Sequence, residues 1–181
     1  MKMWTLVRAG AAAVCVAGVV MCGCASGGQR SRGAGDASQA QAMFERVKKL
    51  EGTWVMADEK GEMHTGVEYR VVSAGSAVCE RMFPGSEHEM VNMYHLDGDR
   101  LLVTHYCAMG TQARMQADGW STPTSIVFKP ESVTNLSSAS AEYMAKLELE
   151  MPDADHLTQK WTSQKEGVET HHTDFAMMRK K

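Results

Sequence analysis

A histidine, a tyrosine and a cysteine stand side by side in the stretch LLVTHYCAMG, residues 101–110, at the end of an apolar run. Such residues serve three kinds of chemistry: nucleophilic catalysis by Cys107 with His105 as base, ligation of a metal or haem through His105, or polar contacts to a bound ligand. Which of these three roles fits depends on the direction in which the strand points each side chain.

In an extended strand, positions 105 and 107 point to the same side about 6.5–7 Å apart, and Tyr106 points to the other side. His105 and Cys107 can therefore contact one ligand. Side chains at i and i+2 run parallel, however, and do not point into hydrogen-bonding contact with each other. The sequence shows no third orienting group and no oxyanion hole. We predict no catalytic residues and no enzyme activity.

Metal binding has little support in the sequence. Zinc needs three or four ligands in tight geometry, and the motifs C-x-x-C, H-x-x-x-H and H-E-x-x-H do not occur. We predict no metal site and no cofactor, with haem held axially by His105 as an alternative. The two cysteines of the folded part, Cys79 and Cys107, lie on strands that a third strand separates, so we predict two free, buried thiols.

The hairpin VNMYHLDGDRLLVTHYC, residues 91–107, decides which side chains line the interior. A two-residue loop at Asp97-Gly98 would place His95 on the opposite face from His105. A three-residue loop with Gly98 left-handed would instead pair His95 with Asp99. The alternation of apolar and polar residues favours the second register. In that register one face of the hairpin carries the mostly apolar residues Val91, Met93, His95, Leu101, Val103, His105 and Cys107. It leaves these on the other: Asn92, Tyr94, Arg100, Thr104 and Tyr106.

The elements that position these residues follow from periodicity. Residues 38–50 predict a helix that begins with a capping box and places these residues on one face: Ala40, Met43, Phe44, Val47 and Leu50. Beyond Gly52 the period becomes 2, with turn signals every 8–12 residues. We predict strands at 53–59, 64–73, 77–83, 88–95, 100–108, 112–118, 124–129, 141–151, 155–163 and 168–179. The fold class is all-β: one antiparallel barrel of about 8–10 strands with a short N-terminal helix.

The short helix followed by Gly52-Thr53-Trp54 resembles the G-x-W opening of lipocalins and related calycin barrels. The resemblance implies that Trp54 starts the first strand at the closed end, and that Arg179 of the last strand packs over its indole. The chain is more similar to lipocalin-like secreted proteins and lipoproteins of bacteria than to true lipocalins. It lacks the opening of the haem-binding nitrobindin barrels, because VMADEKG follows Trp54.

The N-terminus predicts export. Lys2 and Arg8 precede an apolar run, and MCGC at 21–24 resembles a bacterial lipobox in which Cys24 is lipidated. We predict a signal peptide at 1–23, a flexible tether at 24–37 and the barrel at 38–181. Ala25-Ser26 after the cysteine favours an outer-membrane anchor that faces the periplasm. Ordinary cleavage after Ala25 and a retained anchor are the alternatives.

The charge of the chain excludes one class of partner. Residues 1–23 hold two of the 19 Lys+Arg and none of the 22 Asp+Glu, which leaves 17 against 22 and a net charge of −5. Nucleic acid is therefore not an expected partner.

We predict a non-enzymatic envelope lipoprotein whose barrel binds a small hydrophobic or amphipathic ligand. The alternatives are a haem-binding or enzymatic barrel that uses His105 as axial ligand or general base, and a structural lipoprotein with a filled barrel. The residues predicted to line the ligand cavity are Met93, His105, Cys107, Met115, Tyr143 and Trp161.

Overall fold

The computed structural model describes residues 34–181, a closed antiparallel barrel of ten strands with one α-helix. The predicted signal peptide, Cys24 and most of the predicted tether lie outside the described residues. Helix α1 (Ala34–Lys48) begins four residues before its predicted start at 38. The strands are β1 (Gly52–Ala57), β2 (Met63–Val72), β3 (Ala77–Met82), β4 (Met90–Asp97), β5 (Arg100–Tyr106), β6 (Gln112–Thr122), β7 (Ser125–Thr134), β8 (Tyr143–Glu150), β9 (His156–Lys165) and β10 (Val168–Arg179). The predicted fold class is confirmed, and the architecture is consistent with a calycin-like fold.

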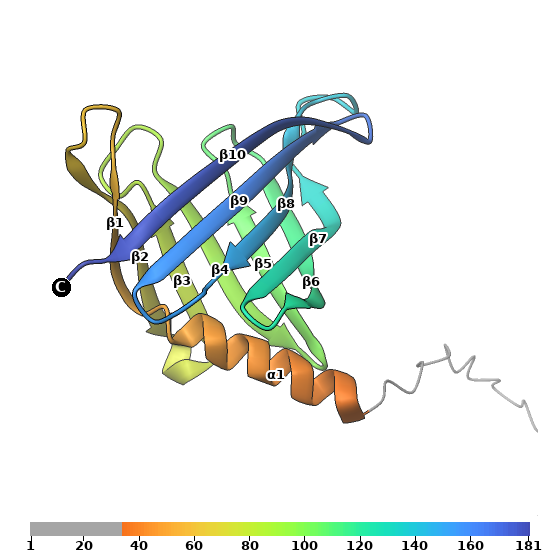
Figure 1. Ribbon diagram of the computed structural model, residues 1–181. Helices are drawn as coiled ribbons and strands as arrows, with labels where there is room; N and C mark the ends of the chain where they lie inside the picture. Colours follow the sequence, from red (N-terminus) through yellow and green to blue (C-terminus); the bar gives the residue numbers. More distant parts are fainter. Residues whose placement is uncertain (1–33) are drawn as a thin grey trace, which may run out of the picture. The chain divides into compact units, whose positions relative to one another are not determined.

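Each strand pairs with its neighbours in the sequence, and β1 pairs with β10 to close the ring. Helix α1 lies across one end of the barrel (Figure 1). Its apolar face is buried in the same core as the inward side chains of the strands; it consists of Ala40, Met43, Phe44, Val47 and Leu50. Among residues 34–181, no helix is long and apolar enough to cross a membrane.

Trp54 joins the helix to the barrel at this closed end. Its side chain is fully buried, and its Nε1 donates a hydrogen bond to Leu50 O at 2.8 Å. The Arg179 guanidinium lies 4.3 Å from the centre of the Trp54 ring, the arrangement that the lipocalin resemblance implies. Arg179 also donates hydrogen bonds to Lys49 O at 2.8 Å and Glu51 O at 2.7 Å, two carbonyls of the segment that joins α1 to β1.

The predicted register of the β4–β5 hairpin is wrong. Asp97 pairs with Arg100 across a two-residue turn of Gly98 and Asp99, so His95 faces Leu102 and not Asp99. Gly98 has φ +63° at the first central position, where a type II′ turn favours glycine. A register shift of one residue exchanges the two faces of a strand, so β4 turns Asn92 and Tyr94 inward.

Two predicted cavity residues consequently lie on the outer wall. Met93 pairs with Cys79 and Thr104, on the face of β4 that points away from the interior. A bulge between Met144 and Lys146 reverses the inward–outward alternation of side chains in β8. Tyr143 therefore points outward, where it pairs with Gln164. The prediction that Met93 and Tyr143 line the interior is therefore wrong, and Met144 packs against the core instead.

Candidate functional site

A fully buried carboxyl, Glu80 on β3, organises the interior of the barrel. Its Oε2 accepts hydrogen bonds from Asn92 Nδ2 at 2.8 Å and from Tyr94 OH at 2.7 Å. Its Oε1 accepts one from Gln159 Nε2 at 2.6 Å. Burial raises the pKa of the Glu80 carboxyl, although the hydrogen bonds from these neighbours act in the opposite direction. Donors from two facing walls of the barrel thus meet on one acidic side chain.

Gln159 on β9 extends this polar cluster to the far wall. Its Nε2 also donates to Tyr69 OH at 2.7 Å, and its Oε1 accepts a hydrogen bond from Trp161 Nε1 at 3.1 Å. All of these side chains are almost completely buried. Their polar atoms have partners, as a dry interior requires.

His105 is joined to the cluster through Asn92. The two residues face each other across β4 and β5, and Asn92 Oδ1 lies 2.7 Å from His105 Nδ1. Asn92 Nδ2 already donates to Glu80, so Oδ1 is the acceptor and Nδ1 of His105 carries the proton. This tautomer leaves the other ring nitrogen, Nε2, as a bare acceptor.

The Nε2 atom of His105 has no hydrogen-bond partner among the described residues, although the side chain is only 1 % exposed. The ring packs against the Trp161 indole with the two centres 4.5 Å apart. Burial lowers the pKa of His105 to about 4, so the imidazole is neutral at pH 7. His105 therefore presents a fixed, neutral lone pair to the interior.

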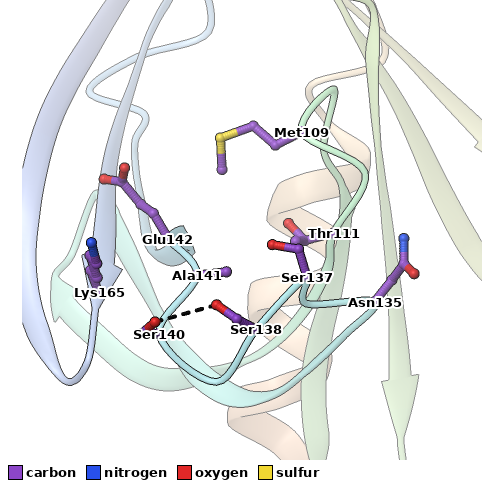
Figure 2. Close-up of a pocket in the computed structure, with 9 residues that line it drawn as sticks. All are labelled: Met109, Thr111, Asn135, Ser137, Ser138, Ser140, Ala141, Glu142 and Lys165. Carbon is purple, nitrogen blue, oxygen red and sulfur yellow. Dashed lines mark hydrogen bonds between the residues drawn. The ribbon is translucent and has the colours of Figure 1, made fainter.

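A pocket of about 490 Å³ opens at the end of the barrel opposite α1, which we call the cup. Three connections between strands surround it: β5–β6, β7–β8 and β9–β10 (Figure 2). Hydroxyl and amide groups predominate in its wall, which is lined by Met109, Thr111, Asn135, Ser137, Ser138, Ser140, Ala141, Glu142 and Lys165. Its volume lies in the range of small-molecule sites.

Thr111 connects the cup to the interior. It is 5 % exposed, and its Oγ1 has no hydrogen-bond partner in the described part of the chain. Because Tyr106 pairs with Gln112, Thr111 lies across from Cys107 on the inner side of the β5–β6 hairpin. The unsatisfied groups of His105 and Thr111 therefore occupy the same inner wall, near the mouth.

The mouth of the cup also carries charge. Glu142 accepts hydrogen bonds from Ser163 Oγ at 2.6 Å and from Thr170 Oγ1. These hydrogen bonds lower the pKa of the Glu142 carboxyl, with a smaller contribution from the nearby His171, so the group is an anion at pH 7. Lys165 lines the same pocket. The mouth thus offers one anion and one cation beside neutral hydroxyl groups.

The structure brings together only part of the predicted ligand-binding set. His105, Met115 and Trp161 lie inside the barrel, where Met115 is fully buried in the core below the cup. Cys107 is half-buried at the inner edge of the mouth, and Cys79 is half-buried on β3. Both are free thiols, as predicted, but the prediction that they are buried is wrong. Met93 and Tyr143 are on the outer wall, as described above.

Sequence reasoning missed Glu80, Asn92 and Gln159. A signal for Glu80 exists: it lies between Val78 and Met82 at a spacing of two, on the inward side of β3. The predicted register of β4 concealed Asn92 by turning it toward solvent. Nothing in the sequence around Gln159 distinguishes it from a surface residue.

One further group of side chains could hold a cation. Ligand atoms of Asp58, Glu62 and His64, at the β1–β2 hairpin, lie within 4.8 Å of one another. All three are exposed, and Asp58 Oδ1 accepts hydrogen bonds from the backbone N–H groups of Lys60 and Glu62. The geometry is that of a turn stabilised by an aspartate, and it points to no bound ion.

The chain was compared with models of known protein families and with curated proteins, and neither comparison finds a match.

Proposed function

We propose that this protein is a non-enzymatic barrel that binds a small amphipathic molecule at its open end. The cup of about 490 Å³ is the observation that carries the proposal. Its hydroxyl groups and its Glu142–Lys165 pair suit the polar part of a ligand, and Met109 and Ala141 suit an apolar part. The free Oγ1 of Thr111 supplies a hydrogen-bonding group at the base of the cup.

The interior below the cup supports a ligand that stays near the mouth. Large side chains fill this region and are almost completely buried; they include Trp54, Tyr69, Tyr94, Phe128 and Leu147. Tyr94 and Phe128 pack edge to face, with ring centres 5.8 Å apart. A ligand that replaced these contacts would lose more than it gained.

Titration with the fluorescent probe 1-anilinonaphthalene-8-sulfonate tests this proposal, because the probe is small and amphipathic. We expect Ala141→Trp, which fills the cup, to abolish binding. Thr111→Val removes one hydrogen-bonding group and should weaken binding about 2- to 10-fold. Ala139→Trp is the matched control, since Ala139 lies in the same loop but is exposed and does not line the cup. Equal binding by all four proteins would contradict the proposal.

A second candidate is an enzymatic barrel in which His105 acts as a general base. The observation in its favour is the bare Nε2 atom, oriented through Asn92 in the way that an amide orients a catalytic histidine. A panel of nitrophenyl esters tests it: hydrolysis that is lost in His105→Gln and kept in His95→Gln would establish this activity.

The residues around His105 do not fit haem. An axial ligand needs an open space beside its nitrogen for the porphyrin, whereas His105 is 1 % exposed and one side of its ring is covered by Trp161. The cup is not lined by His105. We therefore expect haemin titration to give no Soret band that depends on His105.

We further propose that the chain belongs with the lipocalin-like lipoproteins of bacteria and is anchored to the outer membrane through Cys24, facing the periplasm. The support is the sequence of residues 1–24 together with a folded barrel that begins soon after them. When the protein is produced in bacterial cells, the Cys24→Ser variant should carry no lipid, and the mass of the purified protein measures this. Cys22→Ser, two residues away, should leave it in place.

A further inference from the structure

The seam that closes the barrel depends on side chains as well as on backbone pairing. Among the described residues, β1 and β10 pair only through Trp54 with Arg179 and Val55 with Met178. Next to these pairs, residues of both strands line a pocket of about 230 Å³, which we call the methionine pocket. Four of its lining residues are methionines: Met56, Met63, Met177 and Met178.

Two of these methionines pack into the barrel. Met177 is 3 % exposed and belongs to the apolar core, and Met56 packs against the same core. Both side chains reach Gly66 of β2: a Cβ atom at that position would lie 2.9 Å from Met177 Sδ and 3.2 Å from Met56 Sδ. Glycine therefore leaves room for two thioethers, whose apolar contacts join β1, β2 and β10.

The other two methionines are open to solvent. Met63 is 49 % exposed and Met178 is 50 % exposed. Met178 supplies one of the two residue pairs of the seam, and Met63 pairs with Ala57 at the end of β1. An oxidant in solution reaches an exposed thioether more easily than a buried one, so Met63 and Met178 are the reactive residues of the methionine pocket.

We propose that Met63 and Met178 are a reversible oxidation site that weakens the β1–β10 seam when it reacts with a peroxide. With hydrogen peroxide, the thioether sulfur forms a bond to one oxygen as the O–O bond breaks. Sulfur is oxidised by two electrons, the peroxide is reduced, and water leaves. The sulfoxide is polar and favours water over the apolar pocket, so contacts that hold β1 against β10 are lost. The methionine pocket shares no lining residue with the cup and does not depend on the proposed function.

Peptide mapping by mass spectrometry, on the full chain treated with hydrogen peroxide, tests the chemical step. We expect Met63 and Met178 to be oxidised at least about 10-fold faster than Met115 and Met177, which are almost completely buried. Met109 lines the cup and is 54 % exposed, so it should be oxidised as fast as the two seam methionines. Equal rates for Met177 and Met178 would overturn the proposal.

Amide exchange measures the closure of the seam. Lys180 N donates a hydrogen bond to Thr53 O at 2.8 Å, so exchange of the Lys180 amide reports on the contact between the end of β10 and β1. After peroxide treatment we expect this amide to exchange about 10-fold faster, and treatment with methionine sulfoxide reductases to restore the original rate. The amides that pair β4 with β5 should exchange as before.

Variants separate the seam methionines from methionine oxidation elsewhere. Leucine has a similar volume and forms no sulfoxide, so the double variant Met63→Leu/Met178→Leu should keep its Lys180 exchange rate in peroxide. Met109→Leu is the matched control, and its Lys180 amide should exchange faster after oxidation, as in the parent. Both free thiols are present in all three proteins, so their oxidation does not affect the comparison.

Equal acceleration of Lys180 exchange in the double variant and in the parent would overturn the proposal, as would no acceleration in the parent. If the double variant does not fold, the acceleration in Met109→Leu and its reversal by the reductases decide.

Discussion

A single buried carboxyl, Glu80, accepts hydrogen bonds from Asn92, Tyr94 and Gln159. Replacing it by leucine would remove the acceptor of three buried hydrogen bonds, each loss costing about 1–3 kcal/mol. We expect Glu80→Leu to lower the free energy of unfolding by more than about 3 kcal/mol, measured by urea denaturation. Glu80→Gln keeps one acceptor and should cost less.

The control for Glu80 is Glu68, which lies on the outer wall and forms an exposed ion pair with Arg81 at 3.2 Å. Exposed ion pairs contribute about 0–1 kcal/mol. We expect Glu68→Leu to change stability by no more than that. A Glu80→Leu protein as stable as the Glu68→Leu protein would contradict the role given to the buried carboxyl.

His105 makes the fold sensitive to acid. Its pKa is lowered to about 4 in the folded protein from 6.5, so between these values the unfolded chain binds the proton and the folded chain does not. The contribution of His105 to the free energy of unfolding is fully present above pH 6.5. It decreases as the pH drops, by about 3 kcal/mol at pH 4. We expect the loss of stability between pH 7 and pH 4 to be smaller in His105→Gln by about this amount.

Denaturant titrations at several pH values check the prediction for His105. Glu80 contributes with the opposite sign, because its pKa is raised, and this contribution remains in His105→Gln. His88→Gln is the matched control, since His88 is exposed, and the pH dependence of this variant should match that of the parent. Identical curves for the parent and His105→Gln would show that the buried imidazole does not carry the acid sensitivity.

At the scale of elements, Arg179 holds together helix α1, strand β1 and strand β10. It lies over Trp54, and its guanidinium donates hydrogen bonds to the carbonyls of Lys49, Glu51 and Ala154. Lysine cannot reproduce this planar, multidentate contact. We expect Arg179→Lys to cost about 1–3 kcal/mol and to speed amide exchange in α1, whereas Arg114→Lys on the outer wall should do neither.

Most of the fold could be predicted from the sequence, because the helix and the ten strands follow from periodicity and turn residues. Two faces were predicted wrongly, for physical reasons. Asn92 and Tyr94 are polar but lie inside because Glu80, on another strand, accepts their hydrogen bonds, and no local pattern reveals such a match. Tyr143 lies outside because of a bulge in β8. The apolar and polar residues of this segment alternate regularly in the sequence, so the sequence gives no sign of the bulge. The His105 position was predictable; its fixed tautomer was not.

At the scale of the whole molecule, the seam between β1 and β10 is short. Among the described residues the two strands pair through Trp54 with Arg179 and Val55 with Met178, whereas β9 is paired along much of its length on both sides. We expect amides of β10 between Val168 and Met177 that point away from β9 to exchange quickly. Hydrogen exchange followed by NMR measures this, and uniform protection of β9 and β10 would contradict it.

The position of β10 at the end of the barrel has a consequence for how the chain folds. The strand that completes the ring is the last to be synthesised, and its partner β1 is the first, so this closure joins strands more than a hundred residues apart. Contacts of such long sequence separation form slowly. Without β10 the sheet would have two unpaired edges, on β1 and β9, so the ring cannot close before β10 has been synthesised.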